Sequence, residues 1–178
     1  EALARLRAAL SAALPGEWIL GSGWNHEDWA EPAFPCRQDL DGLTPDRPVV
    51  LRRKDGHSVW ANSLALERAG ISVVTTDSPG GAIDRDERGA PTGILRENAM
   101  DLVLACVPQP GPDTLRRALK AGMARAHAAG LTSIHDMEGP VALALFQESH
   151  ARGELKLRVT MQIPADNLDH ALALGLRT

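Results

Sequence analysis

Four short clusters of polar and aromatic residues hold most of the side chains that could do chemistry. In the first, Trp24 and Trp29 frame Asn, His, Glu and Asp side chains in a loop that is entered through Gly23. Two indole rings beside polar groups could line a pocket for an apolar ligand. They could equally anchor the loop on a core that has few aromatic residues. The residues alone leave both interpretations open.

The second cluster runs from Arg53 to Asn62, between an expected strand and an expected helix. This is a place where α/β folds put functional groups. Asp55 and His57 could form a carboxylate–imidazole pair in which the acid fixes the tautomer of the ring. The Asp55-Gly56 dipeptide is also a common turn, and Asn62 could simply cap the following helix.

The third cluster lies between Pro91 and Met100 and contains Glu97. A helix is expected over about 97–106, and a carboxylate in its first turn would meet exposed backbone amides there. Glu97 could instead point into a cleft as an acid, a base or a group that orients a ligand. The residues alone favour the helix-end interpretation.

The fourth cluster, Gly130 to Asp136, ends in a His-Asp pair. His135 and Asp136 follow residues that predict a buried strand, and barrel enzymes keep catalytic residues at the carboxyl ends of their strands. Polar groups are costly to bury there unless they are paired. These two residues are therefore the strongest catalytic candidates by position.

Complete catalytic signatures do not occur in the sequence. None of the six histidines forms a His-x-His or His-Glu-x-x-His motif, and the chain has no glycine-rich phosphate loop. Two cysteines, Cys36 and Cys106, cannot build a cysteine-based zinc site. The metal ligands, if any, stay unknown at this point.

The elements that must position the clusters differ between the two parts of the chain. Up to about residue 110 the pattern is irregular and rich in Pro, Gly and Trp. The expected elements there are a helix over 1–14 ended by Pro15-Gly16, strands near 18–20 and 48–52, a helix over 62–69 and a polar hairpin or loop over 84–89.

Beyond a proline-rich break at 108–112, helices and strands alternate. Helices are expected over 114–129 (capped by Asp113), 140–152 and 167–174, and strands over 131–135 and 155–163. This alternation implies parallel strands with crossover helices. Two strands cannot close a barrel, and the pattern continues to the last residue, so we expect an internal portion of a larger protein.

Composition narrows the class of protein. The chain has 178 residues, 19 Lys+Arg and 23 Asp+Glu, which gives a net charge of −4. Mild acidity spread along the chain predicts no nucleic-acid partner, and no apolar run reaches the roughly 20 residues of a membrane span. We expect a globular, cytoplasmic protein without a membrane partner.

Taken together, the clusters and their separations resemble the N-substituted formamide deformylase-like branch of amidohydrolase family 3. The resemblance covers nearly the whole chain and depends on the order of the motifs rather than on any one of them. The matching segments are Trp18–Gly21 with Gly23-Trp24, Asp39–Asp41 with Pro45–Val49, Asp55–His57 with Trp60, Asn62 and Ser63, Gly80-Gly81 before Asp84-Arg85, Pro91–Gly93 with Leu95 and Glu97, and Gly130–Ser133 with His135-Asp136.

The resemblance implies an α/β fold: part of a (β/α)₈ barrel with a large mixed α/β cap insertion. Residues 1–110 would form the cap, and residues 111–178 would form early β/α units of the barrel. A metal-activated water would cleave a C–N bond in a small amide-type substrate, with zinc as the expected divalent ion. In such enzymes the main metal ligands would lie outside this chain, so the chain alone should hold no metal and be inactive.

The resemblance also implies roles for the clustered residues. His135 and Asp136 would lie at the mouth of the barrel, and Glu97 would orient substrate or water. Substrate-binding residues would be Trp24, Asp55, His57, Trp60 and Asn62. Two alternatives stay open: a small-molecule binding module with a Trp-lined pocket and no catalysis, and a scaffold whose exposed strand edges pair with another chain. Homo-oligomerisation is also left open.

Overall fold

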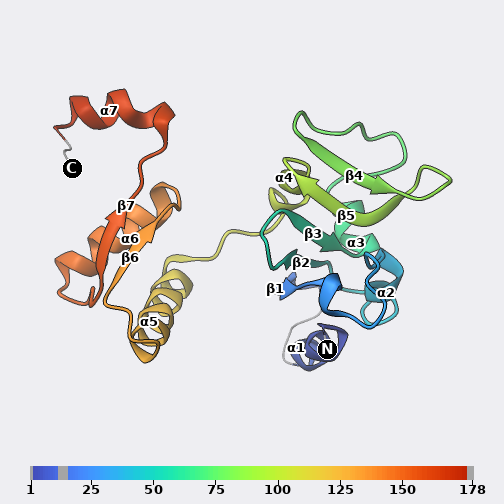
Figure 1. The fold of residues 1–178 in the computed structure, drawn as a ribbon, viewed down its shortest axis with the longest axis horizontal. Coiled ribbons are helices and arrows are strands. Elements are labelled where there is room, and N and C mark those ends of the chain that lie inside the picture. The colour runs from blue at the N-terminus through green and yellow to red at the C-terminus, as the bar shows by residue number, and fades with distance from the viewer. Residues whose placement is uncertain (1, 12–15, 176–178) are drawn as a thin grey trace. The chain divides into compact units, whose positions relative to one another are not determined.

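The structure, a computed structural model, describes residues 2–11 and 16–175. Within it the chain divides into two compact units, Glu1–Pro108 and Gln109–Thr178, here called the N-terminal and C-terminal units (Figure 1). The fold class is α/β, as expected. No helix in the described ranges is long and apolar enough to cross a membrane.

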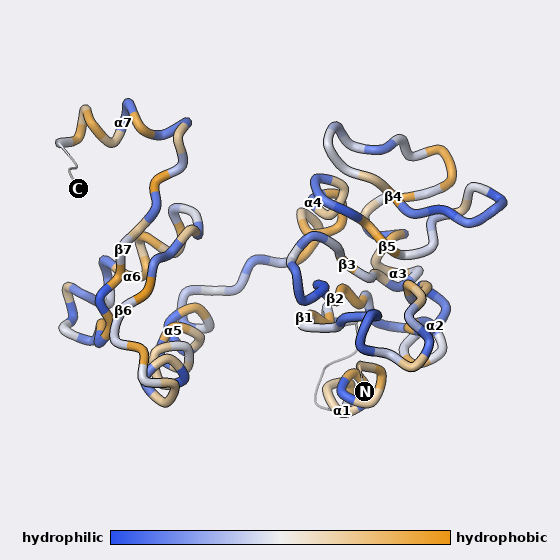
Figure 2. The backbone as a smooth tube through the Cα atoms, viewed as in Figure 1, coloured by the Kyte–Doolittle hydropathy of each residue, from blue (hydrophilic) through white to orange (hydrophobic). Residues whose placement is uncertain are grey.

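A five-stranded mixed sheet forms the centre of the N-terminal unit (Figure 1). Its strand order is β1-β2-β3-β5-β4; β1 pairs with β2 in parallel, and the other neighbours are antiparallel. The strands are β1 (Ile19–Trp24), β2 (Val49–Arg53), β3 (Ser58–Ala61), β4 (Gly81–Arg85) and β5 (Pro91–Glu97). The antiparallel hairpin β4–β5 has a hydrophilic tip, which confirms the polar hairpin expected over 84–89 (Figure 2).

Helices cover both faces of this sheet, because successive strand residues point to opposite sides. The short helices of the unit are α1 (Ala2–Leu10), η1 (His26–Asp28), α2 (Arg37–Asp41), α3 (Ser63–Arg68) and α4 (Met100–Leu104). One buried cluster packs Val50, Val59 and Leu95 against α3 and α4. The cluster on the other face packs Trp60 and Trp24 with residues of α1 and α2.

The C-terminal unit contains a β–α–β arrangement. Strands β6 (Ser133–Asp136) and β7 (Arg158–Met161) are parallel, with Ile134 opposite Val159. The helices are α5 (Pro112–Ala128), α6 (Pro140–Ala151), η2 (Ala165–Asn167) and α7 (Leu168–Ala173). Helix α6 provides the crossover between the two strands, as the sequence predicts. Closure of further strands into a barrel stays a prediction.

Several expected boundaries need correction. The first helix ends at Leu10 rather than near residue 14; the predicted terminator Pro15 lies outside the described residues. Asp113 does not cap α5, because Pro112 already occupies the first helical turn and Gly111 is the N-cap. The strand expected to be buried over 131–135 is β6, whose residues alternate between exposed and half-buried.

Glu97 needs the largest correction. It is the last residue of β5, where it pairs with Gly81 of β4, and the next helix begins only at Met100. The expected helix over 97–106 is therefore wrong at its start, because pairing with a strand 16 residues away continues through Glu97. Its carboxylate does not belong to a helical first turn.

Candidate functional site

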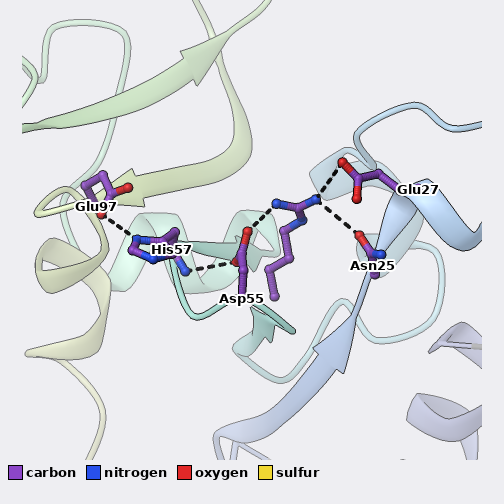
Figure 3. Close-up of polar contacts among 6 residues, drawn as sticks. Asn25, Glu27, Asp55, His57 and Glu97 are labelled. Carbon is purple, nitrogen blue, oxygen red and sulfur yellow. Dashed lines mark hydrogen bonds and ion pairs between the residues drawn. The ribbon is translucent and has the colours of Figure 1, made fainter.

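The end of β5 and the start of β3 bring Glu97 and His57 together (Figure 3). His57 Nδ1 lies 3.0 Å from Glu97 Oε2, and the two side chains are 67% and 54% exposed. The hydrogen bond to Glu97, together with its negative charge, raises the pKa of His57. A ring that donates Nδ1–H to a carboxylate presents its Nε2 lone pair outward in the neutral form, or an Nε2–H donor when protonated.

The backbone of Glu97 is strained. Its φ is +48°, and in the described residues it is the one non-glycine with a positive φ. A left-handed backbone at such a residue costs on the order of 1–3 kcal/mol and persists only where the surroundings impose it. The pairing with Gly81 and a 3.1 Å hydrogen bond from Glu97 N to His57 O impose it here. Backbone and side chain of Glu97 thus both bind His57.

Asp55 contacts the backbone of His57 rather than its ring. Asp55 Oδ1 accepts a 3.0 Å hydrogen bond from His57 N. This hydrogen bond is the main reason why the pKa of Asp55 is lowered, with the charge of Arg53 contributing in the same direction. The carboxylate–imidazole pair that the sequence suggested for Asp55 is therefore formed by Glu97 instead, and Asp55 fixes the turn that carries His57.

Arg53 extends this network toward the first cluster. It forms an ion pair with Asp55, a 3.4 Å ion pair with Glu27 and a 3.1 Å hydrogen bond to the Oδ1 atom of Asn25. Arg53 was not predicted as the connecting residue. The only available signal was its position at the end of a strand, next to Asp55.

A second arginine fixes the end of β5. Arg96 donates hydrogen bonds of 2.7 and 2.6 Å to both carboxylate oxygens of Asp84, and its guanidinium lies 4.3 Å from the centre of the Phe34 ring. Such bidentate pairs are strong and directional. The ion pair with Asp84 therefore fixes Arg96, the residue that precedes Glu97.

Two predicted substrate-binding tryptophans are core residues. Trp24 and Trp60 are 5% and 1% exposed, and their rings meet edge to face at 5.9 Å. Their indole N–H groups donate to Leu51 O at 2.8 Å and to Cys36 O at 2.9 Å. The alternative that Trp24 anchors the loop on the core is thus what the packing shows, and Trp60 has little surface left for a ligand.

Asn62 is also enclosed. It is 0% exposed and is the N-cap of α3, where its Oδ1 accepts from Ala65 N and also from Val49 N. Its amide nitrogen donates to Thr44 O and Arg47 O. The helix-capping interpretation is confirmed, and we do not carry Asn62 into the candidate site.

His135 and Asp136 lie at the end of β6 in the C-terminal unit. His135 is exposed, while Asp136 is half-buried and accepts a 3.0 Å hydrogen bond from Glu138 N. They keep the strand-end position that the sequence predicts. They belong to a different unit from His57, Asp55 and Glu97, which lie together within the N-terminal unit.

A metal site is not formed by the residues described. Across 2–11 and 16–175, no group of three or more His, Cys, Asp or Glu side chains is placed to hold a metal ion. Zinc needs three or four ligands in a fixed geometry. The donors present do not fit such an ion on their own, and we assign no ligand.

Comparison with known proteins decides the family. The family model described as "Amidohydrolase family" matches residues 1–178. The chain belongs to the amidohydrolase family. It is 35% identical over 159 residues to YtcJ of Bacillus subtilis, a protein named as an amidohydrolase, and 32% identical over 146 residues to an N-substituted formamide deformylase of Arthrobacter pascens. These alignments cover 86% and 79% of this amidohydrolase chain.

Solved structures agree in fold. Two metal-dependent hydrolases of uncharacterised activity, from Pyrococcus horikoshii and Pyrococcus furiosus, match 96% and 89% of the amidohydrolase chain with TM-scores of 0.61 and 0.56. Sequence identities are 24% and 26%, and the chain covers 32% and 31% of those structures. It likewise spans 30% of YtcJ and 27% of the deformylase.

Proposed function

We propose that this chain is part of a metal-dependent amidohydrolase that hydrolyses the C–N bond of a small amide- or formamide-type molecule. The observation that carries the proposal is the family match over all 178 residues. Similarity to a protein named N-substituted formamide deformylase supports the substrate class. The proposal includes zinc, a cytoplasmic location and no nucleic-acid or membrane partner, and it leaves homo-oligomerisation open.

In this proposal the residues that bind the metal belong to parts of the protein outside these 178 residues. A bound divalent ion supplies an activated water and polarises a carbonyl. The donors in the described residues do not form a site for it. We therefore expect the 178-residue chain to be inactive by itself and derive no step through the ion.

Within this proposal the N-terminal unit is the cap and contributes His57 to substrate binding. Glu97 holds the ring through Nδ1, and Asp55 holds the turn through the backbone N–H of His57. The outward Nε2 can then accept a hydrogen bond from a substrate N–H, or donate one to a carbonyl when the ring is protonated. His135 and Asp136 lie at a strand end in the proposed partial barrel, in the position where such folds carry catalytic groups.

The test compares this chain with the product of the complete gene, each with and without added zinc, on a panel of N-formyl amines and simple amides. We expect hydrolysis by the complete product only, measured as released amine. Zinc-dependent turnover by the 178-residue chain would overturn the missing-ligand part of the proposal. Absence of C–N hydrolysis by the zinc-loaded complete product across the panel would overturn the reaction class.

A further inference from the structure

A hollow of about 620 Å³ in the N-terminal unit has neither His57 nor Glu97 in its lining. It is lined by α1, by β1 and by the loop that follows β1. Small-molecule sites in proteins have volumes of roughly 300–1,000 Å³ and combine an apolar wall with a few polar groups. The hollow has this size and both kinds of lining.

Two tryptophans form its aromatic wall. Trp24 and Trp29 both line the hollow, and their ring centres are 6.2 Å apart. The Trp24 ring is fixed by its hydrogen bond to Leu51 O and by edge-to-face packing on Phe34 and Trp60. Trp29 is half-buried and therefore offers ring surface toward the hollow. Because these rings are already held in place, binding of a ligand requires little reorganisation of the protein.

The hollow is open beside Gly23 of β1. A Cβ at Gly23, whose φ is +92°, would meet no atom within 4 Å. Asn25 also lines the hollow, and since its Oδ1 is bonded to Arg53, its amide nitrogen is the group available to a ligand acceptor. The geometry thus provides an aromatic face, an open entrance and a hydrogen-bond donor.

The described lining residues carry one charge of each sign. Of the described residues that line the hollow, Arg5 contributes one guanidinium and Asp28 one carboxylate. A charged ligand would lose hydration without meeting a net opposite charge, whereas an uncharged one avoids that penalty. The lining therefore favours an uncharged ligand.

We propose that this hollow is a binding site for an uncharged aromatic compound with a hydrogen-bond acceptor, independent of any metal. The compound's ring stacks on the half-buried Trp29, which lies beside the buried Trp24, and its acceptor meets the amide of Asn25. None of its lining residues belongs to the His57–Glu97 pair, and Asn25 connects to the network around that pair only through Arg53.

The test follows quenching of tryptophan fluorescence by 2-phenylethanol, in buffer containing a chelator, with ligand-observed NMR as a second readout. We expect saturable binding in the unsubstituted chain. Trp29→Ala should weaken binding by about tenfold, because one aromatic contact and its buried area are worth roughly 1.4 kcal/mol. Trp29→Phe, which keeps a ring, should bind within about threefold of the unsubstituted chain.

Matched controls separate the site from other surfaces. Trp18→Phe changes a tryptophan that packs on the opposite cluster and should leave the Kd unchanged. Phenylethylammonium and 3-phenylpropionate, the cationic and anionic counterparts, should both bind more weakly than the alcohol. Unsaturable quenching, an unchanged Kd in a folded Trp29→Ala chain, or tighter binding of either charged analogue would overturn the proposal. The hydrolysis assay of the complete gene product is unaffected by any of these outcomes.

Discussion

The two units of the chain differ in how their strands are covered. In the N-terminal unit, Val59 and Leu95 are fully buried on one face of the sheet, and Trp60 is buried on the other. In the C-terminal unit, β6 and β7 pair only with each other within 16–175, and their residues alternate between exposed and half-buried. Parallel strands are normally covered on both faces. The N-terminal unit thus contains its own packing partners, whereas the β6–β7 sheet is only partly covered in the described part of the chain.

This contrast fits the proposal that the C-terminal unit is part of a barrel. Neighbouring strands and helices would then bury the faces of β6 and β7 that are open in this chain. Two paired strands alone are marginally stable in water. The contrast therefore predicts that substitutions cost more stability in the first unit than in the second.

Trp60→Ala should have the largest effect. Removing an indole that is 1% exposed leaves a cavity and removes the hydrogen bond to Cys36 O, so we expect the free energy of unfolding to fall by about 3–5 kcal/mol. Val159→Ala, on half-buried β7, should cost less than about 1 kcal/mol. Urea unfolding followed by far-ultraviolet circular dichroism measures both. Equal costs would contradict the difference between the units.

Asn62→Ala should have the second-largest effect and lower the free energy of unfolding by about 2–3 kcal/mol. The change removes the cap of α3 and leaves buried backbone groups of Val49, Thr44 and Arg47 unpaired. Asn62→Asp is the matched control, since it keeps the accepting oxygen but loses both donors. It should still destabilise, because two carbonyls lose their partner and a charge is buried. Wild-type stability in either variant would show that the network is not structural.

Glu97→Gln should have the smallest effect on stability and a clear effect on titration. In the unsubstituted chain Glu97 raises the pKa of His57 above its ordinary value of 6.5. The stabilisation from this pair is therefore complete below pH 6.5 and disappears as the pH rises through the higher folded-state pKa. NMR titration of His57 should show its pKa fall in the variant. An unchanged pKa would mean that the two side chains do not interact in solution.

Local patterns predicted the parts of the fold that local chemistry determines. Residues close in the sequence are enough to predict three features: the strand that ends at Arg53, the helix cap at Asn62 and the polar tip of the β4–β5 hairpin. Glu97 was missed because its conformation is imposed by pairing with Gly81, a contact that residues 91–106 do not reveal. Its strained φ has no sequence signal at all, since glutamate rarely adopts it.

The burial of side chains was the second feature that was predicted wrongly. The family resemblance implied that Trp24 and Trp60 bind substrate, but both rings are buried in the cluster that packs on α1 and α2. The residues over 131–135 also predicted a buried strand. The burial of a strand depends on which other elements cover it, and the residues of the strand do not reveal them. Both errors concern contacts between distant segments. The strand-end position of His135 and Asp136 was nevertheless predicted correctly, because it depends only on where the strand stops.

We propose that this chain is one portion of a metal-dependent C–N hydrolase, and we expect it to hold no metal by itself. The most direct measurement is the metal content of the purified chain and of the complete gene product, determined side by side after dialysis. The account predicts tightly bound divalent metal in the complete product, with amide hydrolysis that a chelator abolishes, and none in the 178-residue chain. A stoichiometric ion retained by the short chain, or a complete product that hydrolyses amides equally well after its metal is removed, would contradict it.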